Sequence, residues 1–118
     1  MKDFYVGFEG EPEIRFVVNG VGVPEQVLRI WDGYFDAIVE RIELESGQWT
    51  GLALPYHLHE GWYDGAPWKV PDLVHVLGQW RRIRTAGLSP QCLEVHAAVL
   101  ELLNTAVECN AEVWISEE

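Results

Sequence analysis

The segment from residue 24 to residue 46 constrains the fold of this chain more than any other stretch. When its residues are placed about 100° apart around a helix axis, the apolar side chains fall on one broad face. That face contains Val27, Leu28, Ile30, Trp31, Tyr34, Phe35, Ile38 and Ile42. Pro24 suits the first position of a helix, and Gly47 suits the position just after its end. The spacing therefore predicts one amphipathic helix over residues 24–46.

Shorter periodic segments predict the rest of the fold. Apolar side chains alternate over residues 3–9 and 13–18, and a short Gly/Pro turn between two such runs predicts a hairpin. Helical spacing returns at residues 72–84 and 90–108, and alternation returns at residues 111–116. We expect an α+β fold in a single domain, residues 1–118, with three helices on one face of a small antiparallel sheet. The sheet would consist of the N-terminal hairpin and the C-terminal strand. Residues 48–60 could add a paired strand, although Pro55 argues for an edge position.

The net charge restricts the classes of partner. Nineteen acidic residues against eight Lys and Arg give a net charge of −11. Direct binding to nucleic acid needs a basic surface that neutralises phosphates, and binding to an anionic membrane needs the same. Both are therefore disfavoured, whereas a basic protein partner is favoured electrostatically. The alternative is that the acids only keep a small protein soluble.

Part of this charge lies in stripes along helix faces. On the helix predicted over residues 24–46, four acids share the polar side: Asp32, Asp36, Glu40 and Glu43. Like charges at four-residue spacing cost about 0.2–0.5 kcal/mol per pair in an isolated helix. On the last predicted helix, acids at seven-residue spacing form a second stripe: Glu94, Glu101 and Glu108. We interpret the first stripe as a candidate partner-binding face, and a solvated helix surface is the alternative for both.

Aromatic residues gather in a segment that has no helical or strand period. Residues 61–71 are rich in Gly and Pro, yet they contain Trp62, Tyr63 and Trp68. Trp and Tyr are enriched at binding hot spots, and loops carry function more readily than core elements do. These three residues are therefore candidate partner-binding anchors. Alternatively, the loop folds back and its rings cover one end of the core.

Catalytic and metal-binding signals are weak. His57 and His59 would project to the same side of a strand, and Glu60 follows them, so they could share a metal or act as an acid–base pair. Glu60, Asp64, His75 or His96 could supply a third ligand. No established zinc, nucleophile or phosphate-binding motif is present in the sequence, so we expect no cofactor, no metal and no enzymatic activity. His96 falls in the apolar arc of the last helix, where a hydrogen-bonded core histidine is expected.

The remaining expectations concern the compartment. Cys92 and Cys109 are 17 residues apart on one predicted helix, which places them about 25 Å apart, too far to bond to each other. Reduced thiols are expected in a cytoplasmic protein. The N-terminal residues have no apolar signal-peptide region, and no run approaches membrane-spanning length.

In size, acidity, architecture and aromatic loop, the chain resembles the bacterial immunity proteins of toxin–immunity pairs. The resemblance implies a monomer or homodimer that neutralises a basic toxin, in particular a nuclease, by occluding its active site. Asp32, Asp36, Glu40 and Glu43 would meet the toxin's cations, and Trp62, Tyr63 and Trp68 would anchor the complex. One alternative is an acidic secretion chaperone or adaptor that binds a client segment along a sheet edge or groove. Another is a small metal- or His-dependent enzyme that uses His57, His59 and Glu60.

Overall fold

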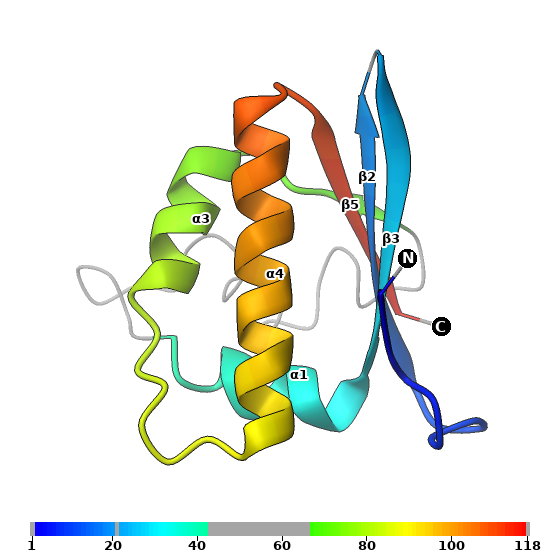
Figure 1. Ribbon diagram of the computed structural model, residues 1–118, viewed down its shortest axis with the longest axis vertical. Helices are drawn as coiled ribbons and strands as arrows, with labels where there is room; N and C mark the ends of the chain where they lie inside the picture. The colour runs from blue at the N-terminus through cyan, green and yellow to red at the C-terminus, as the bar shows by residue number, and fades with distance from the viewer. Residues whose placement is uncertain (1, 21, 43–66, 118) are drawn as a thin grey trace.

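The computed structural model describes residues 2–20, 22–42 and 67–117 (Figure 1). In chain order, these residues form β1 (Lys2–Phe4), β2 (Glu13–Gly20), β3 (Val23–Trp31), α1 (Asp32–Val39), β4 (Trp68–Lys69), α3 (Leu73–Arg81), α4 (Pro90–Glu108) and β5 (Glu112–Glu117). The predicted possibility of a strand within residues 48–60 lies outside the described residues.

The strands of the described segments form one five-stranded mixed sheet in the order β1-β3-β2-β5-β4. β2 pairs antiparallel with both β3 and β5, so that Phe16 lies between Leu28 and Ile115. The N-terminal hairpin therefore joins β2 to β3, and not residues 3–9 to β2 as predicted. β1 instead pairs parallel with β3. Residues 5–11 form two successive turns, in which Gly7 and Gly10 adopt positive φ angles of 96° and 95°, and these turns carry the chain from β1 round to β2.

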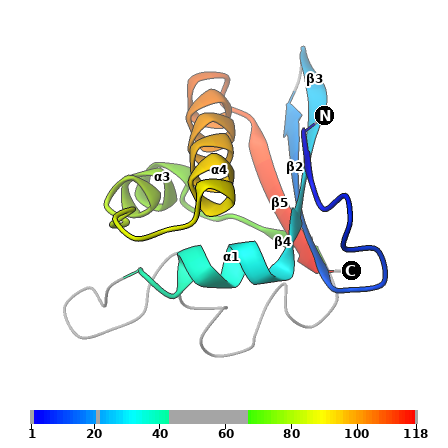
Figure 2. The same ribbon diagram turned by 60° about the horizontal axis from the view of Figure 1, so that its bottom comes forward.

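The helices lie on one face of the sheet. α3 and α4 lie side by side against this face, and α1 crosses one end of it, directly after β3 (Figures 1 and 2). Between helices and sheet, the described residues bury one apolar core that includes Phe16, Ile30, Phe35, Trp80 and Leu103. The predicted fold class is confirmed for the described residues, because the helices cover one face of a small sheet that contains an N-terminal hairpin and the C-terminal strand.

The helix predicted over residues 24–46 begins at Asp32 and not at Pro24. Residues 24–31 belong to β3, where Leu28 and Ile30 point into the core and are 2% and 0% exposed. Apolar residues at 27, 28, 30 and 31 satisfy both a helical period and an alternating one, so the sequence pattern alone does not separate them. Pairing with β2 decides in favour of the strand, because it places Arg29 on the opposite face beside Arg15 and within reach of Glu13.

Caps and close packing set the helix boundaries. The Asp72 side chain accepts a hydrogen bond from the His75 N–H at the start of α3, and Ser89 Oγ accepts one from the Cys92 N–H at the start of α4. In α1, a Cβ added to Gly33 would lie 2.5 Å from the Trp31 ring. Glycine therefore allows this ring to pack against the first turn of the helix, where it stacks on Phe8 at 4.2 Å between ring centroids.

Candidate functional site

α1 carries the acids that were predicted as the partner-binding stripe. Asp32 begins the helix and Asp36 follows one turn later, and both are half-buried. Glu40 forms the C-terminal cap and is exposed. Glu43 lies outside the described residues. Asp36 lies on the predicted polar side of the helix, and a solvent-facing side chain would be expected there. That expectation is wrong, because α1 packs its two turns against the end of the sheet. Glu40 fits the expectation.

The carboxyl group of Asp32 lies where a negative charge is disfavoured. The pKa of Asp32 is raised, mainly by burial and secondly by repulsion from Glu117 at the end of β5. A hydrogen bond with Asp36 partly opposes this rise. A hydrogen bond between two carboxyl groups requires a proton on one of them. Among the described residues, Asp32 Oδ1 is buried and has no hydrogen-bond partner. Asp32, Asp36 and Glu117 form what we call the α1 acid cluster, in which keeping Asp32 ionised costs the fold some stability.

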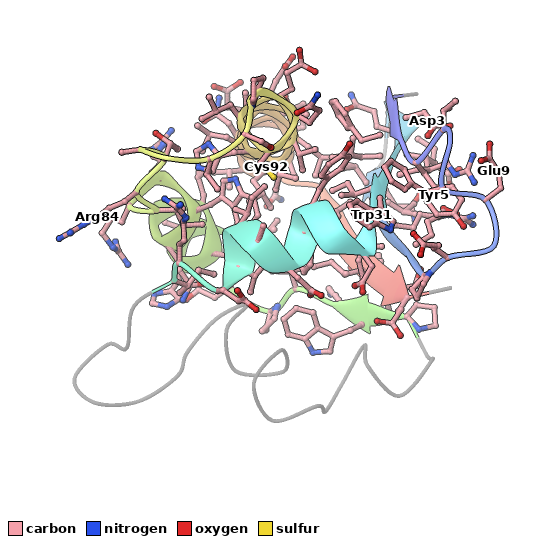
Figure 3. The ribbon with its side chains drawn as sticks, turned by 90° about the horizontal axis from the view of Figure 1, so that it is seen from below. Asp3, Tyr5, Glu9, Trp31, Arg84 and Cys92 are labelled. Atoms are coloured by element: carbon pink, nitrogen blue, oxygen red, sulfur yellow. The ribbon has the colours of Figure 1, made fainter. Side chains whose placement is uncertain are left out.

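Several cations of the chain make their contacts away from this cluster. Arg29 binds Glu13 and Asp3 on the opposite face of the sheet, and Lys69 forms an ion pair with Glu112 at 2.8 Å. Arg41 donates hydrogen bonds to backbone carbonyls near Arg84, which lies at the opposite end of α1 from Trp31 (Figure 3). The sequence of residues 43–66 contains no Lys or Arg.

The aromatic anchors of the prediction are only partly described. Trp68 lies in β4, opposite Ile115 of β5, and its half-buried side chain packs against the core. Part of the segment predicted as loop is thus a short edge strand, and Trp68 covers one end of the core, which was the alternative interpretation for this ring. Trp62 and Tyr63 lie outside the described residues. A binding role for these aromatic residues stays a prediction.

The second acidic stripe follows the exposed side of α4. Glu94, Glu101 and Glu108 are all exposed, as the seven-residue spacing predicted. Glu108 accepts a hydrogen bond from the Asn104 side chain at 3.2 Å. The stripe extends along α4 from near α1 to the opposite end of the helix (Figure 1).

An ion-pair network on the open face of the sheet escaped the sequence analysis. Glu13 is only 5% exposed. Its two carboxylate oxygens each accept a hydrogen bond from Arg29 at 2.9 Å, and Oε2 also accepts one from Arg15 at 3.0 Å. Arg29 also donates a hydrogen bond to the Asp3 carboxylate at 3.1 Å, and its guanidinium carbon lies 5.1 Å from the centre of the Tyr5 ring. These hydrogen bonds, first of all that from Arg29, lower the pKa of Glu13. The strand register places Arg15 and Arg29 around this one buried carboxylate, and the sequence pattern alone did not reveal that arrangement.

His75 and His96 are the histidines within the described part of the chain. His96 stacks on Trp80 with ring centroids 5.6 Å apart, and its Nε2 lies 3.1 Å from the Trp80 backbone oxygen. This contact confirms the predicted hydrogen bond to a carbonyl, although the His96 ring is half-buried and not part of the buried core. His75 is half-buried on α3. Among the described residues, no group of three His, Cys, Asp or Glu side chains could hold a metal ion. His57, His59 and Glu60 lie outside those residues.

Two further observations concern membrane-spanning helices and the cysteines. In residues 2–20, 22–42 and 67–117, no helix is both long and apolar enough to cross a membrane. Cys92 is buried and Cys109 is exposed, and both are free thiols, as their separation predicted.

Comparison with models of known protein families, with curated protein sequences and with solved structures gives no match for this chain.

Proposed function

We propose that this protein is an immunity protein that binds a basic toxin and blocks the toxin's active site with the acids of α1. A nuclease is the expected target, because its active site is built to hold phosphate, and carboxylates can take the places of phosphates beside Lys and Arg. In this proposal Asp32, Asp36 and Glu40 meet the toxin's cations. Trp62, Tyr63 and Trp68 remain the predicted anchors beside them.

One observation carries the proposal: the fold keeps the α1 acid cluster half-buried, although burial and repulsion from Glu117 raise the pKa of Asp32. Groups that a protein holds in an unfavourable state are often those it needs for function. A Lys or Arg from a partner would relieve both the burial cost and the repulsion, so binding would recover stability that the free protein lacks. A surface that served only solubility would place its acids in full contact with water, as α4 does with Glu94 and Glu108.

A capture experiment tests the proposal. Tagged wild-type protein would be used to isolate partners from cells that encode it, alongside Glu40→Lys and a matched control, Glu108→Lys. Both variants change the net charge equally at an exposed position, but Glu108 lies at the end of α4 remote from α1 (Figure 1). We expect a basic partner whose affinity falls by about tenfold or more with Glu40→Lys and little with Glu108→Lys. The affinity should also weaken with salt.

The captured partner's own activity completes the test. The proposal predicts an enzymatic toxin that the wild-type protein inhibits at a 1:1 ratio. A partner without such activity would contradict the inhibitor function and favour an adaptor. A toxin that binds Glu40→Lys as tightly as wild type would contradict the use of the α1 face.

A further inference from the structure

The connection between β1 and β2 consists of two successive turns that share Phe8. The Phe8 N–H donates a hydrogen bond to the Tyr5 backbone oxygen, and the Glu11 N–H donates one to the Phe8 backbone oxygen, each at 3.0 Å. A glycine with positive φ holds the third position of each turn, as type II turns require. Val6 and Glu9 hold the second positions, and both are exposed. These hydrogen bonds order the segment before a partner binds, which reduces the entropy lost on binding.

Three aromatic rings pack together where these turns meet the end of β3 and the start of α1. Phe8 stacks on Trp31 with ring centroids 4.2 Å apart and an interplanar angle of 5°. Tyr34 meets both rings edge-on, with its centroid 5.5 Å from that of Phe8 and 5.0 Å from that of Trp31. All three rings are half-buried, and Val6 is 72% exposed. We call Val6, Phe8, Trp31 and Tyr34 the aromatic platform.

The platform extends beyond the main core. The buried core of the described residues includes neither Phe8 nor Trp31, and Tyr34 packs only against its margin. Figure 3 shows Trp31 at the β3 end of α1 and Glu9 on the outer side of the turns. Apolar surface that reaches water in this way is typical of an interaction site, and Trp and Tyr are the residues most enriched at binding hot spots.

The charge around the platform indicates what would bind there. Glu9 and Glu11 are exposed on the turns, and the Glu9 carboxylate accepts a hydrogen bond from a backbone N–H of the same turns at 3.0 Å. Residues 5–12 contain no Lys or Arg. Arg29 has its charge compensated by the ion-pair network on the open face of the sheet. A basic partner therefore matches this surface, whereas a second copy of the chain would bring a net charge of −11 to it.

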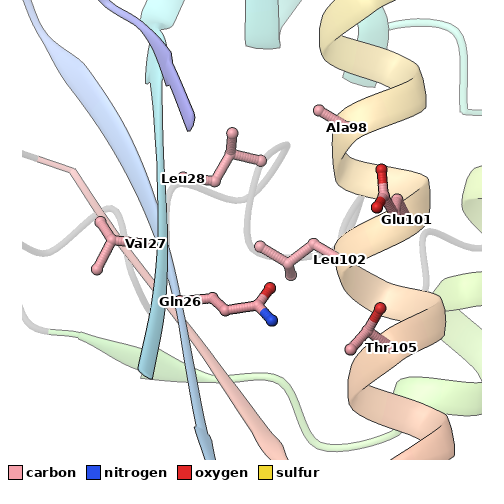
Figure 4. Close-up of a pocket in the computed structure, with 7 residues that line it drawn as sticks. All are labelled: Gln26, Val27, Leu28, Ala98, Glu101, Leu102 and Thr105. Atoms are coloured by element: carbon pink, nitrogen blue, oxygen red, sulfur yellow. The ribbon is translucent and has the colours of Figure 1, made fainter. Parts of the chain in front are cut away.

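The groove between β3 and α4 offers a different chemistry. It has a volume of about 200 Å³, and Gln26 and Leu28 point into it from β3, opposite Leu102 and Thr105 of α4 (Figure 4). No aromatic residue is among the described residues that line it. A cationic side chain would find no ring to stack on there, so the groove serves as the comparison site in the test below.

We propose that the aromatic platform anchors an arginine side chain of the basic partner, with the guanidinium group stacked on the exposed ring surface and directed toward Glu9. A guanidinium group stacks on aromatic faces, and the arginine methylenes can lie on Val6. The inference rests on the proposed function for the identity of the partner. It adds a second set of anchors beside the first turn of α1.

The probe is a capped peptide with the sequence glycine–arginine–leucine–arginine–glycine, and the control peptide carries neutral citrulline in place of arginine. With wild-type protein we expect saturable shifts of the Trp31 indole N–H signal and of the backbone amide signals of residues 6–10 in NMR spectra. Trp31→Phe assigns the indole signal. The citrulline peptide should bind about tenfold more weakly, because it keeps the shape of arginine without its charge.

Three substitutions locate the site. Phe8→Leu keeps an apolar side chain but removes the ring, and it should weaken peptide binding by about fivefold. Glu9→Gln should weaken it by about threefold, whereas Glu108→Gln, the same change at a remote exposed acid, should leave it within about 1.5-fold. Val6→Ser should weaken it by about threefold. Val74→Ser is the matched control, since Val74 is 69% exposed on α3.

Several results would overturn the inference. These are the absence of saturable shifts up to about 10 mM peptide, equal binding of the citrulline peptide, or shifts centred on Gln26 and Thr105 of the groove. A captured toxin that is lost with Glu40→Lys but binds Phe8→Leu as tightly as wild type would overturn the platform and leave the proposed function standing. Peptide binding at the platform without capture of a toxin would support the arginine site and contradict the inhibitor function.

Discussion

Trp80→Ala is expected to lower the free energy of unfolding by about 3–5 kcal/mol, the range measured for deletion of large buried aromatic side chains. Trp80 is 0% exposed and joins α3 to the rest of the core. Its ring stacks on Phe35 of α1 and on His96 of α4, with centroids 6.3 and 5.6 Å away. Its indole N–H donates a hydrogen bond to the His96 backbone oxygen at 3.0 Å. The substitution therefore removes packing between three helices and one hydrogen bond that ties α3 to α4.

Urea denaturation measures this effect. The midpoint should fall while the slope of free energy against denaturant stays similar. Trp80→Phe keeps most of the ring but loses the donor, so we expect a smaller loss of about 1–2 kcal/mol. Val74→Ala on the same helix is the matched control, since Val74 is 69% exposed and should change stability by less than about 0.5 kcal/mol. A loss below about 1 kcal/mol for Trp80→Ala would mean that α3 does not pack as described.

Glu13→Gln is expected to cost about 2–4 kcal/mol at pH 7, because removing one partner from a buried ion pair leaves the others poorly compensated. The amide keeps the shape of the side chain, but it cannot accept on both oxygens from Arg29 while also binding Arg15. Arg29 would retain Asp3, at 3.1 Å, and this contact limits the loss. Glu25→Gln on β3 is the control, because Glu25 is exposed and its neutralisation should change stability by less than about 0.5 kcal/mol.

The pH dependence of this effect has a definite sign. The hydrogen bond from Arg29 lowers the pKa of Glu13 in the folded protein relative to the ordinary value of 4.5. The folded state therefore binds this proton less tightly than the unfolded state, and the stabilisation is fully present above pH 4.5. It is lost as the pH falls through the lower pKa of the folded protein. The stability difference between wild type and Glu13→Gln should thus be largest near neutral pH and shrink below pH 4.5, and a difference that stays constant with pH would contradict the network.

The sequence was sufficient for the parts of the fold that depend on local signals. Helical spacing over residues 90–108 predicted α4, and strict alternation predicted β2 and β5. It was not sufficient at residues 24–31, where an apolar run fits both a helix and a strand. The choice there depends on long-range contacts, such as Arg29 with Glu13, 16 residues apart in the chain. The partner of β1 depends on the turns at Gly7 and Gly10, whose positive φ angles are a property of the folded backbone.

The candidate site, like the fold, was only partly predictable from the sequence. The charge and spacing of Asp32, Asp36 and Glu40 were visible in the sequence, but the burial of Asp32 was not. Burial depends on α1 beginning at the end of β3, and the repulsion depends on β5, which brings Glu117 to Asp32 from 85 positions later in the chain. The pairing of residues 23–27 with β2 was likewise hidden, because it exists only when these residues form a strand. Long-range pairing created each of these features.

The raised pKa of Asp32 gives a second pH dependence, opposite in sign to that of Glu13. Because burial and Glu117 raise this pKa above its ordinary value of 3.8, the folded state binds the proton more tightly than the unfolded state does. The contribution of Asp32 to stability is therefore greatest below pH 3.8 and declines as the pH rises through the raised pKa of the folded protein. At neutral pH the charged group opposes folding, which is the cost that the proposed function explains.

The most direct test of that function is to measure thermal stability and partner affinity on the same variant, Asp32→Asn, which keeps the shape of the side chain and removes its charge. At pH 7 we predict a rise in Tm of about 2–4 °C, corresponding to about 0.5–1 kcal/mol for a domain of this size. The rise should diminish toward pH 4, near the ordinary pKa of 3.8. Affinity for the captured basic partner should fall by about tenfold. A variant that is less stable at pH 7, or one that binds the partner as tightly as wild type, would contradict the claim that the α1 acids are kept for binding.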